Sequence, residues 1–232
     1  MGVRPTKALR QLAQIDSYFT GFVLCRQEDR PCLSWTAALA AVAKRIAACN
    51  ACQLGPSRTT TVPGEGNPDS GIMLVGEAPG IEEDLQGRPF IGKAGQLLDR
   101  ILQACHLDRT RIFITNVIKC RPPNNRPPRP EEISACVPFL YEQIRIVQPR
   151  LLIALGAHAA RTLLKSDRTI GQLRGRPHLC QIEGCQGPIN LVATYHPSHL
   201  LRNYTYENRK AVWEDMKLAM RLAGLEGPTG GP

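Results

Sequence analysis

The sequence predicts an α/β domain of three layers, in which helices cover both faces of a central four-stranded parallel sheet. Four short apolar runs rich in β-branched residues have the composition of buried strands: Ile72–Val75, Ile112–Thr115, Leu151–Leu155 and Ile189–Thr194. A helical pattern follows each of the first three runs, at about 97–105, 133–147 and 157–165. Strands that alternate with helices pair in parallel, because each crossover returns the chain to the same end of the sheet.

Helices are also expected outside this alternation. The N-terminal segment has helix-like stretches at about 5–15 and 34–48, and the second is rich in alanine, the strongest helix former. A last helix is expected at about 206–223, while the Gly- and Pro-rich residues 55–71 read as a loop. The expected organisation has three parts: an N-terminal helical extension 1–44, a main domain 45–225 and a disordered tail 226–232.

The chain is basic, with 29 lysines and arginines against 20 aspartates and glutamates and a formal net charge of +9. A basic surface typically binds a polyanion, most often nucleic acid, although many basic proteins have no such partner. No uninterrupted apolar run approaches the ~18 residues of a membrane-spanning helix, and the N-terminus lacks the layout of a secretory signal. We therefore expect a cytoplasmic protein that does not bind membranes.

Nine cysteines are many for a chain with no export signal, and an odd number argues against a disulfide framework. Cys49 and Cys52 form a Cys-x2-Cys pair, and Cys120 and Cys136 follow further along the chain. Four such thiolates suit either a tetrahedral zinc ion or a cubane iron–sulfur cluster. The alternative is four unrelated buried thiols. Two further pairs are expected to be structural or free: Cys25 with Cys32, and Cys180 with Cys185.

Ligands of an open parallel sheet bind beyond the carboxyl ends of its strands, which selects the segments 76–95, 116–129, 156–158 and 195–203. The first segment is rich in glycine, which permits backbone to approach a ligand closely, but it lacks the GxGxxG and GK[ST] spacings of nucleotide loops. It also carries four carboxylates: Glu77, Glu82, Glu83 and Asp84. These could hold a water, a divalent cation or a cationic transition state, or they could form a solvated acidic turn.

The segment after the fourth strand places His196 at a carboxyl end of the sheet, followed by the rigid Pro197. A histidine there can donate a hydrogen bond to a developing oxyanion, although a lone histidine is more often structural. Leu200 and Leu201 precede Arg202, so that an apolar wedge could lie beside a phosphate contact. Proteins that deform duplex DNA insert such side chains between bases.

With these segments assembled, the chain resembles the family 4 uracil-DNA glycosylases, the iron–sulfur branch of the uracil-DNA glycosylase superfamily. The resemblance covers about residues 45–222 and rests on several motifs in order: the four cysteines, GEAPG followed by EED, GRPFIGKAGQLLD, TNVIKCRPPNNRPP and HPSHLLR. It implies a three-layer α/β/α fold, a 4Fe–4S cluster rather than zinc on the four cysteines, and removal of uracil from DNA. Such a repair enzyme would work at the nucleoid of a prokaryotic cell.

The resemblance also assigns roles to individual residues. Phe90 would stack on the uracil flipped out of the DNA, and Asn116 would read the amide edge of that base. His196 would stabilise negative charge on uracil O2 as the glycosidic bond lengthens. Glu77 would position the attacking water or stabilise the sugar cation.

Further residues would shape the pocket or contact the DNA backbone. Backbone groups of Gly76 to Ala78 would line the pocket, and Glu83, or its neighbour Glu82 or Asp84, would exclude the methyl group of thymine. The expected DNA contacts are Lys93, Arg121, Arg126, Leu200, Leu201 and Arg202, with Arg129 as a further candidate in the loop 121–130. The alternative is that residues 121–130 form a solvated surface loop that does not contact DNA.

Hydrolysis needs no lysine nucleophile, so we expect base release without strand nicking, and Lys93 and Lys119 are interpreted as phosphate or structural contacts. The cluster is expected to be structural.

One branch of the superfamily crosslinks to uracil-containing DNA instead of releasing the base. That branch has a glutamine in the first motif and a histidine in the loop after the second strand. Here the motif is GEAPG and the loop 121–130 has no histidine, which favours turnover.

Two alternatives from other classes stay open at this point. One is a non-catalytic iron–sulfur module that binds uracil-containing DNA or serves a polymerase or clamp, and the other is a structural zinc protein. A monomer acting on single- or double-stranded DNA is the expectation for the enzyme. Residues 179–188 look like a short insertion before the fourth strand, and neither it nor residues 1–44 receives a role.

Overall fold

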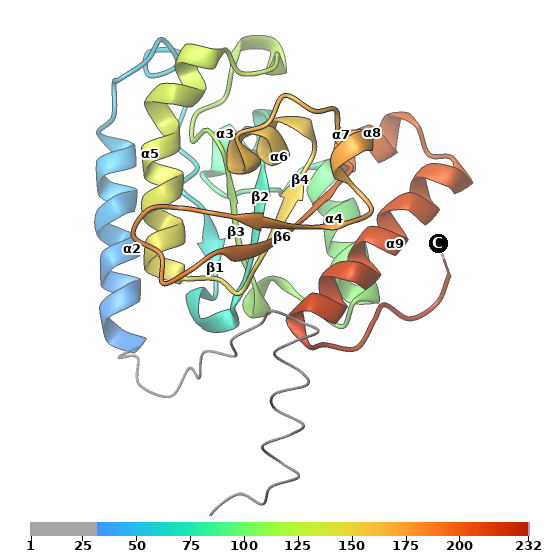
Figure 1. Ribbon diagram of the computed structural model, residues 1–232. Helices are drawn as coiled ribbons and strands as arrows, with labels where there is room; N and C mark the ends of the chain where they lie inside the picture. Colours follow the sequence, from blue (N-terminus) through green and yellow to red (C-terminus); the bar gives the residue numbers. More distant parts are fainter. Residues whose placement is uncertain (1–31, 232) are drawn as a thin grey trace, which may run out of the picture. The chain divides into compact units, whose positions relative to one another are not determined.

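The computed structural model describes residues 32–231, whose arrangement is shown in Figure 1. The helix expected at about 5–15 and the first cysteine, Cys25, lie outside these residues. Across the described part of the chain, no helix combines the length and the apolar character needed to cross a membrane.

One six-stranded sheet forms the centre of the fold, in the order β1-β3-β2-β4-β6-β5. Its inner strands are mutually parallel: β2 (Ile72–Gly76), β3 (Phe113–Asn116), β4 (Leu151–Leu155) and β6 (Ile189–Thr194). This confirms the predicted central sheet. Two antiparallel edge strands were not predicted, β1 (Glu65–Gly66) beside β3 and β5 (Pro177–Cys180) beside β6. The first has two residues and the second begins with proline, so neither shows a strand pattern in the sequence.

Eight α-helices are assigned within residues 32–231: α2 (Cys32–Ala47), α3 (Ile81–Gln86), α4 (Lys93–Ala104), α5 (Pro130–Val147), α6 (Ala157–Leu164), α7 (Ile170–Leu173), α8 (Pro197–Arg202) and α9 (Tyr206–Ala223). The helices expected from the sequence correspond to α2, α4, α5, α6 and α9, and α9 agrees at both ends. The short helices α3, α7 and α8 were not predicted, because one or two turns are too few residues to show a period.

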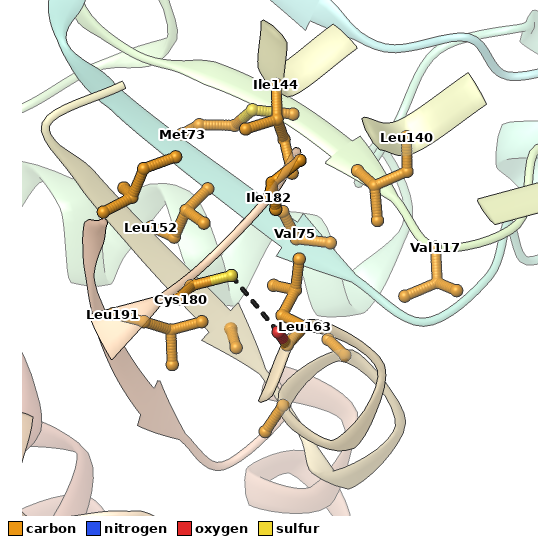
Figure 2. Close-up of a cluster of buried hydrophobic side chains, with 14 of the residues drawn as sticks. Met73, Val75, Val117, Leu140, Ile144, Leu152, Leu163, Cys180, Ile182 and Leu191 are labelled. Carbon is orange, nitrogen blue, oxygen red and sulfur yellow. Dashed lines mark hydrogen bonds between the residues drawn. The ribbon is translucent and has the colours of Figure 1, made fainter. Parts of the chain in front are cut away.

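The two faces of the sheet bury separate hydrophobic cores, since successive side chains of a strand point to opposite faces. Met73 and Val75 of β2 belong to one core with side chains of α5, α6 and α7. Ile72 and Leu74 belong to the other, with side chains of α4, α8 and α9. Figure 2 shows the first core, in which Ile144 of α5 packs above β2. The helices therefore cover both faces, as the three-layer prediction requires (Figure 1).

Helix α2 packs as part of the main domain. Its Val42 and Ile46 are each 1 % exposed, and Leu39 packs against the core that contains α5. The predicted boundary between residues 44 and 45 falls inside this continuous helix and is corrected here, because the compact unit begins at Leu33. The apolar face of α2 can be buried only against the sheet domain, so the helix cannot be a separate extension.

Residues 179–188 are partly regular structure. Leu179 and Cys180 complete strand β5, and the Cys180 thiol donates a hydrogen bond to Leu163 O at 3.2 Å (Figure 2). Cys180 and Cys185 are both free thiols, as expected. At the C-terminus, residues 225–231 contain no helix or strand, and Thr229 N donates to Ala104 O at 2.9 Å. Disorder of the tail 226–232 stays a prediction.

A buried ion pair anchors the segment that follows β6. The Asp215 carboxylate of α9 accepts hydrogen bonds from Thr194 Oγ1 (2.8 Å), Arg174 Nε (3.0 Å) and Gly175 N (2.9 Å). The Arg174 guanidinium in turn lies 5.2 Å from the centroid of the Tyr195 ring. Because an unpaired buried charge is costly, these contacts hold the backbone just before His196 in one position.

Candidate functional site

A cavity of about 590 Å³ opens at the carboxyl end of the parallel sheet. The segments that follow β2, β3, β4 and β6 all contribute to its wall, as expected for ligand sites of this sheet type. Eight of the residues predicted from the sequence line it: Glu77, Ala78, Glu83, Phe90, Asn116, Arg126, His196 and Arg202. Glu77 and Arg202, which are 125 positions apart in the sequence, therefore line the same cavity.

Gly76 is the residue whose backbone the Asn116 side chain and the Phe90 ring approach closely. A Cβ atom added to Gly76 would lie less than 3.0 Å from both Asn116 Oδ1 and the Phe90 ring, so the absence of a side chain lets these two groups converge. Phe90 itself has a φ of 47°, in the left-handed region that few non-glycine residues adopt. Its carbonyl oxygen accepts a hydrogen bond from the Arg109 guanidinium, which holds the strained turn. The backbone therefore presents the aromatic ring at a defined angle.

Asn116 is 1 % exposed, and its Oδ1 has no hydrogen-bond partner among the described residues. A buried polar atom left without a partner costs about 1–3 kcal/mol, so such an atom is expected to have a ligand as its partner. Its backbone is held from behind, because Nζ of the buried Lys119 donates to Asn116 O (2.7 Å), Thr115 Oγ1 (2.6 Å) and Gln143 Oε1 (2.7 Å). Of the two interpretations of Lys119, the structure supports the structural one and excludes a phosphate contact.

His196 lies beside Phe90, with ring centroids 5.5 Å apart. Burial lowers the pKa of His196 to about 4, although the charges of Glu77 and Glu83 act in the opposite direction. The imidazole is therefore neutral near pH 7. Ser198 N donates to His196 Nδ1 at 3.1 Å, so the proton of the neutral ring resides on Nε2. The neutral ring therefore keeps an N–H donor, which suffices to stabilise a developing oxyanion.

Glu77 is paired with His158, a residue that the sequence analysis did not assign to the site. His158 Nδ1 lies 2.7 Å from Glu77 Oε2, and both side chains line the cavity. Burial acts to raise the pKa of Glu77, but the hydrogen bond and charge of His158, together with the charges of His196 and Arg202, lower that pKa below its ordinary value. The segment 156–158 had been selected by its place after β4, so the strand-end rule contained the signal for His158.

The other acidic residues of the first loop face different surroundings. Glu83 lines the cavity, but its carboxylate accepts hydrogen bonds from Gly80 N (3.0 Å), Ile91 N (2.7 Å) and Gly92 N (3.0 Å). It therefore holds the loop that carries the aromatic ring, and exclusion of thymine by Glu83 stays a prediction. The neighbouring Asp84 is buried and accepts from the backbone of residues 59 and 60, outside the cavity lining.

Of the two leucines in the predicted apolar wedge, only Leu201 is exposed. Leu200 is 2 % exposed and belongs to the core formed with α4 and α9, so its assignment as a DNA contact was wrong. Leu201 is 42 % exposed, and Arg202 next to it is exposed and lines the cavity. In a short helix such as α8, adjacent side chains point in different directions, which separates Leu200 from Leu201. Insertion of Leu201 into DNA stays a prediction.

The basic residues expected to contact phosphates differ in their surroundings. Lys93 is exposed at the start of α4, and Arg121 Nε donates to Asn125 Oδ1 at 2.7 Å. Arg126 lines the cavity and is bound through Nη1 and Nη2 to the buried Glu132 carboxylate. Arg129 Nη1 lies 3.5 Å from Gln53 Oε1. Their contact with DNA stays a prediction, although Arg126 is fixed by its ion pair.

The four predicted metal ligands meet around a second cavity, on the side of the sheet covered by α2 and α5. Its lining includes Cys49, Cys52, Cys120 and Cys136. The Arg58 guanidinium donates to Cys49 O (2.7 Å) and to Cys120 Sγ (3.5 Å). Within residues 32–231, no group of three or more His, Cys, Asp or Glu converges on a position for one metal ion. The shared cavity is the observation that fits these soft thiol donors to a common inorganic group.

Additional donors surround the thiols. Lys119 N donates to Cys136 Sγ at 3.3 Å, and hydrogen bonds to ligand sulfurs are usual at iron–sulfur sites. Arg58 Nη2 also donates to Ala47 O at the end of α2, at 2.9 Å. Arg58 was not predicted from the sequence, because an arginine in a polar loop carries no local signal. Its contacts join the end of α2 to the segment that follows β3.

Comparison with known proteins shows the family to which the chain belongs. Residues 63–217 match the family model described as the uracil DNA glycosylase superfamily. The chain is 45 % identical over 187 residues to the Type-4 uracil-DNA glycosylase of Thermotoga maritima, which spans 80 % of this chain and 95 % of that protein. It is 47 % identical over 158 residues to the Type-4 enzyme of Pyrobaculum aerophilum, spanning 66 % and 80 %.

A more distant relative belongs to a neighbouring type. The Type-5 uracil-DNA glycosylase of Thermus thermophilus is 33 % identical over 183 residues, which span 71 % of this chain and 81 % of that protein. The Type-4 identities are higher over similar shares of the chain. The chain therefore belongs to the uracil-DNA glycosylase superfamily, within its Type-4 family.

Proposed function

We propose that this protein is a monofunctional DNA repair glycosylase, which hydrolyses the N-glycosidic bond of uracil in DNA and leaves an abasic site. The observation that carries the proposal is the convergence of Phe90, Asn116, His196 and Glu77 on one cavity. An aromatic face, a carboxamide, a neutral imidazole and a carboxylate are the groups that an extruded pyrimidine and its breaking bond require.

Recognition of the base rests on Phe90 and Asn116. The Asn116 Oδ1, unpaired among the described residues, can accept the N3–H of uracil, while the amide nitrogen can donate to O4. Cytosine offers an acceptor at N3 and a donor at the exocyclic amine, so it mismatches the same carboxamide. Phe90, a residue that is 5 % exposed and lines the cavity, supplies the stacking surface through its ring. Selectivity for uracil then follows from one side chain.

Bond cleavage separates charge across the cavity. As the bond between C1′ and uracil N1 breaks, its electron pair leaves with the base and the sugar becomes cationic. The His196 Nε2–H donates to uracil O2 and stabilises the anion, while the ionised Glu77 stabilises the sugar. Water oxygen then bonds to C1′ and releases a proton, and the uracil anion gains one, so the products are free uracil and an abasic site.

The surroundings of the lysines support hydrolysis without strand nicking. A lyase needs an amine that can attack C1′ of the sugar to form a Schiff base. Lys119 is fully buried and donates to three protein oxygens, and it lies outside the lining of the large cavity. Lys93 also lies outside that lining. No amine of the described chain is therefore positioned at the proposed reaction centre.

A direct assay tests the proposal. An end-labelled oligonucleotide with one uracil, single-stranded or paired with guanine, is incubated with the protein and analysed on denaturing gels with and without alkali. Alkali-dependent cleavage supports base release without lyase activity. A band shifted by the mass of the protein under denaturing conditions would indicate crosslinking, and intact DNA after alkali would leave only binding; either result would overturn the proposal.

The change Asn116→Asp is expected to erode the choice of uracil over cytosine. An ionised carboxylate cannot donate to O4, and a protonated one can match the edge of cytosine. The ratio of the uracil rate to the cytosine rate should fall about 10- to 100-fold, the cost of one unsatisfied buried polar group. Single-turnover rates on matched oligonucleotides measure this ratio, and an unchanged ratio would remove Asn116 from base recognition.

We further propose that Cys49, Cys52, Cys120 and Cys136 hold a 4Fe–4S cluster. The support is their shared cavity, the sulfur chemistry of the donors and the flanking N–H donors, together with membership of the Type-4 family. Such a cluster could carry electrons, but its ligands come from the end of α2, the segment after β3 and helix α5. The cysteines would therefore join these segments structurally, apart from the cavity where the base binds.

Replacing Cys120 with serine is expected to lower the iron content and the solubility of the protein, because one of four ligands is lost. Iron and sulfide analysis, with visible absorbance, measures cluster occupancy in the purified protein. The control is Cys185→Ser, a free thiol outside the cysteine cavity, which should retain full iron. Full occupancy in Cys120→Ser would show that the ligand is wrongly assigned, and zinc in place of iron in the unmodified protein would overturn the cluster.

A further inference from the structure

His158 lines the large cavity but has no part in the base recognition described above. It is the second residue of α6, directly after β4, and its Nδ1 lies 2.7 Å from Glu77 Oε2. The two side chains are 31 % and 30 % exposed, so the pair is accessible from the cavity but not free in solvent. The contact joins residues 81 positions apart in the sequence.

Strand pairing and backbone hydrogen bonds hold the backbone around this pair. Glu77 follows β2 and His158 follows β4, and these strands are neighbours in parallel register, with Val75 opposite Ala154. Ile118 N donates to Glu77 O at 3.2 Å, and Gly156 N donates to Thr194 O at 2.8 Å. Both side chains therefore project from strand ends that are tied to their neighbours. The pairing follows from the sheet register rather than from a mobile loop.

We propose that His158 is a positioning residue for base release: it orients the Glu77 carboxylate and keeps it ionised, so that Glu77 acts as a fixed negative charge facing the sugar. This inference rests on the proposed glycosylase function and deepens it. A carboxylate that accepts a hydrogen bond from a neighbouring imidazole is a poor proton acceptor, which favours electrostatic stabilisation of the sugar cation over general-base catalysis.

The charged groups around the pair support a positioning role for His158 and an electrostatic role for Glu77. Burial acts to raise the pKa of Glu77, and His158, His196 and Arg202 together lower it below the ordinary value. The hydrogen bond to Glu77 raises the pKa of His158, against burial and the charge of Arg161 on the same helix. Among the groups that lower the pKa of Glu77, His158 has the largest effect. Without His158, the pKa of Glu77 should rise. As the pH falls, Glu77 should then become protonated at a higher pH than in the unmodified protein.

The first test is the pH profile of His158→Asn. Single-turnover release of uracil is measured from about pH 4.5 to 8 for the unmodified protein, for His158→Asn and for His106→Asn, an exposed histidine outside the cavity. In His158→Asn the acid limb should move to higher pH, so that the rate near pH 5, relative to that near pH 7.5, falls about tenfold or more. His106→Asn should follow the unmodified profile.

A double-mutant cycle identifies the partner. In Glu77→Gln there is no carboxylate to keep ionised, so adding His158→Asn should leave the remaining pH profile unchanged. The same shift in both backgrounds would assign the effect of His158 to another group. A uniform loss of rate with no shift of the acid limb would make His158 merely structural and overturn the inference.

A measurement on folded protein with His158 intact completes the test. Titration of the His158 imidazole by NMR should show a lower midpoint in Glu77→Gln than in the unmodified protein, since the hydrogen bond that raises it is gone. An unchanged midpoint would overturn the pairing even if His158→Asn fails to fold. If the unmodified protein releases no uracil, the proposed function fails; if it does and these shifts are absent, only this inference fails.

Discussion

Replacing His196 with alanine is expected to slow uracil release about 100- to 1000-fold while leaving the affinity for DNA nearly unchanged. The imidazole is placed to donate to uracil O2, and that donation strengthens only as negative charge develops on the base. Removing the donor therefore raises the energy of the transition state far more than that of the bound ground state. His196→Ala also removes the acceptor for Ser198 N, so folding should be verified by thermal melting.

Single-turnover kinetics at saturating protein and equilibrium binding to an uncleavable uracil analogue separate the two effects. His178→Ala is a suitable control, because His178 contacts Leu173 O on the far edge of the sheet and lies outside the cavity. Equal losses in rate and affinity would assign His196 to binding. The pKa of His196, near 4, also predicts that titration of this ring contributes no change in rate between about pH 6 and 8.

Replacing Gly76 with alanine should have a similarly large effect, although it adds only one methyl group. The new Cβ would overlap Asn116 Oδ1 and the Phe90 ring, both of which are buried and tied to their own backbones. Displacing groups of a catalytic pocket by about 1 Å can cost about 100-fold in rate, and overpacking costs about 1–3 kcal/mol of stability. We therefore expect a loss of uracil release larger than the loss of stability explains.

Gly187→Ala is the matched control, because an added Cβ there meets no described atom within 4 Å and its φ is not in the left-handed region. It should retain both activity and melting temperature. Rates on uracil-containing DNA, compared at a temperature where both variants are folded, measure the effect. A Gly76→Ala protein with normal rates would show that the Phe90 ring and the Asn116 carboxamide need not converge as they do in this structure.

Several features of the fold could be predicted because they depend on local patterns. The inner strands are continuous apolar runs, and α4, α5 and α9 carry apolar residues at helical spacing over several turns. The rule that ligands bind at the carboxyl ends of parallel strands then selected the segments carrying Asn116 and His196, and the structure brings both to one cavity. The short edge strands and one-turn helices form because neighbouring elements provide partners, which local patterns do not record.

Errors arose where residues adjacent in sequence point to different places. Leu200 and Leu201 are identical residues at adjacent positions, yet Leu200 packs into the core and Leu201 is exposed. The acidic residues of the first loop also differ, because Glu77 faces the cavity while Asp84 binds the backbone beneath it. Which way a side chain points depends on the angle at which its helix or loop packs, and that angle is set by the whole domain.

The parallel sheet, the four cysteines and the residue types suited to an excised pyrimidine can all be recognised in the sequence. The pairing of His158 with Glu77, the burial of Lys119 behind Asn116 and the place of α2 in the main domain come from tertiary packing. They escape the sequence because the protonation and orientation of a group depend on burial and on neighbouring charges. Those neighbours come from strands far apart in the chain, and the packing of the sheet alone brings them together.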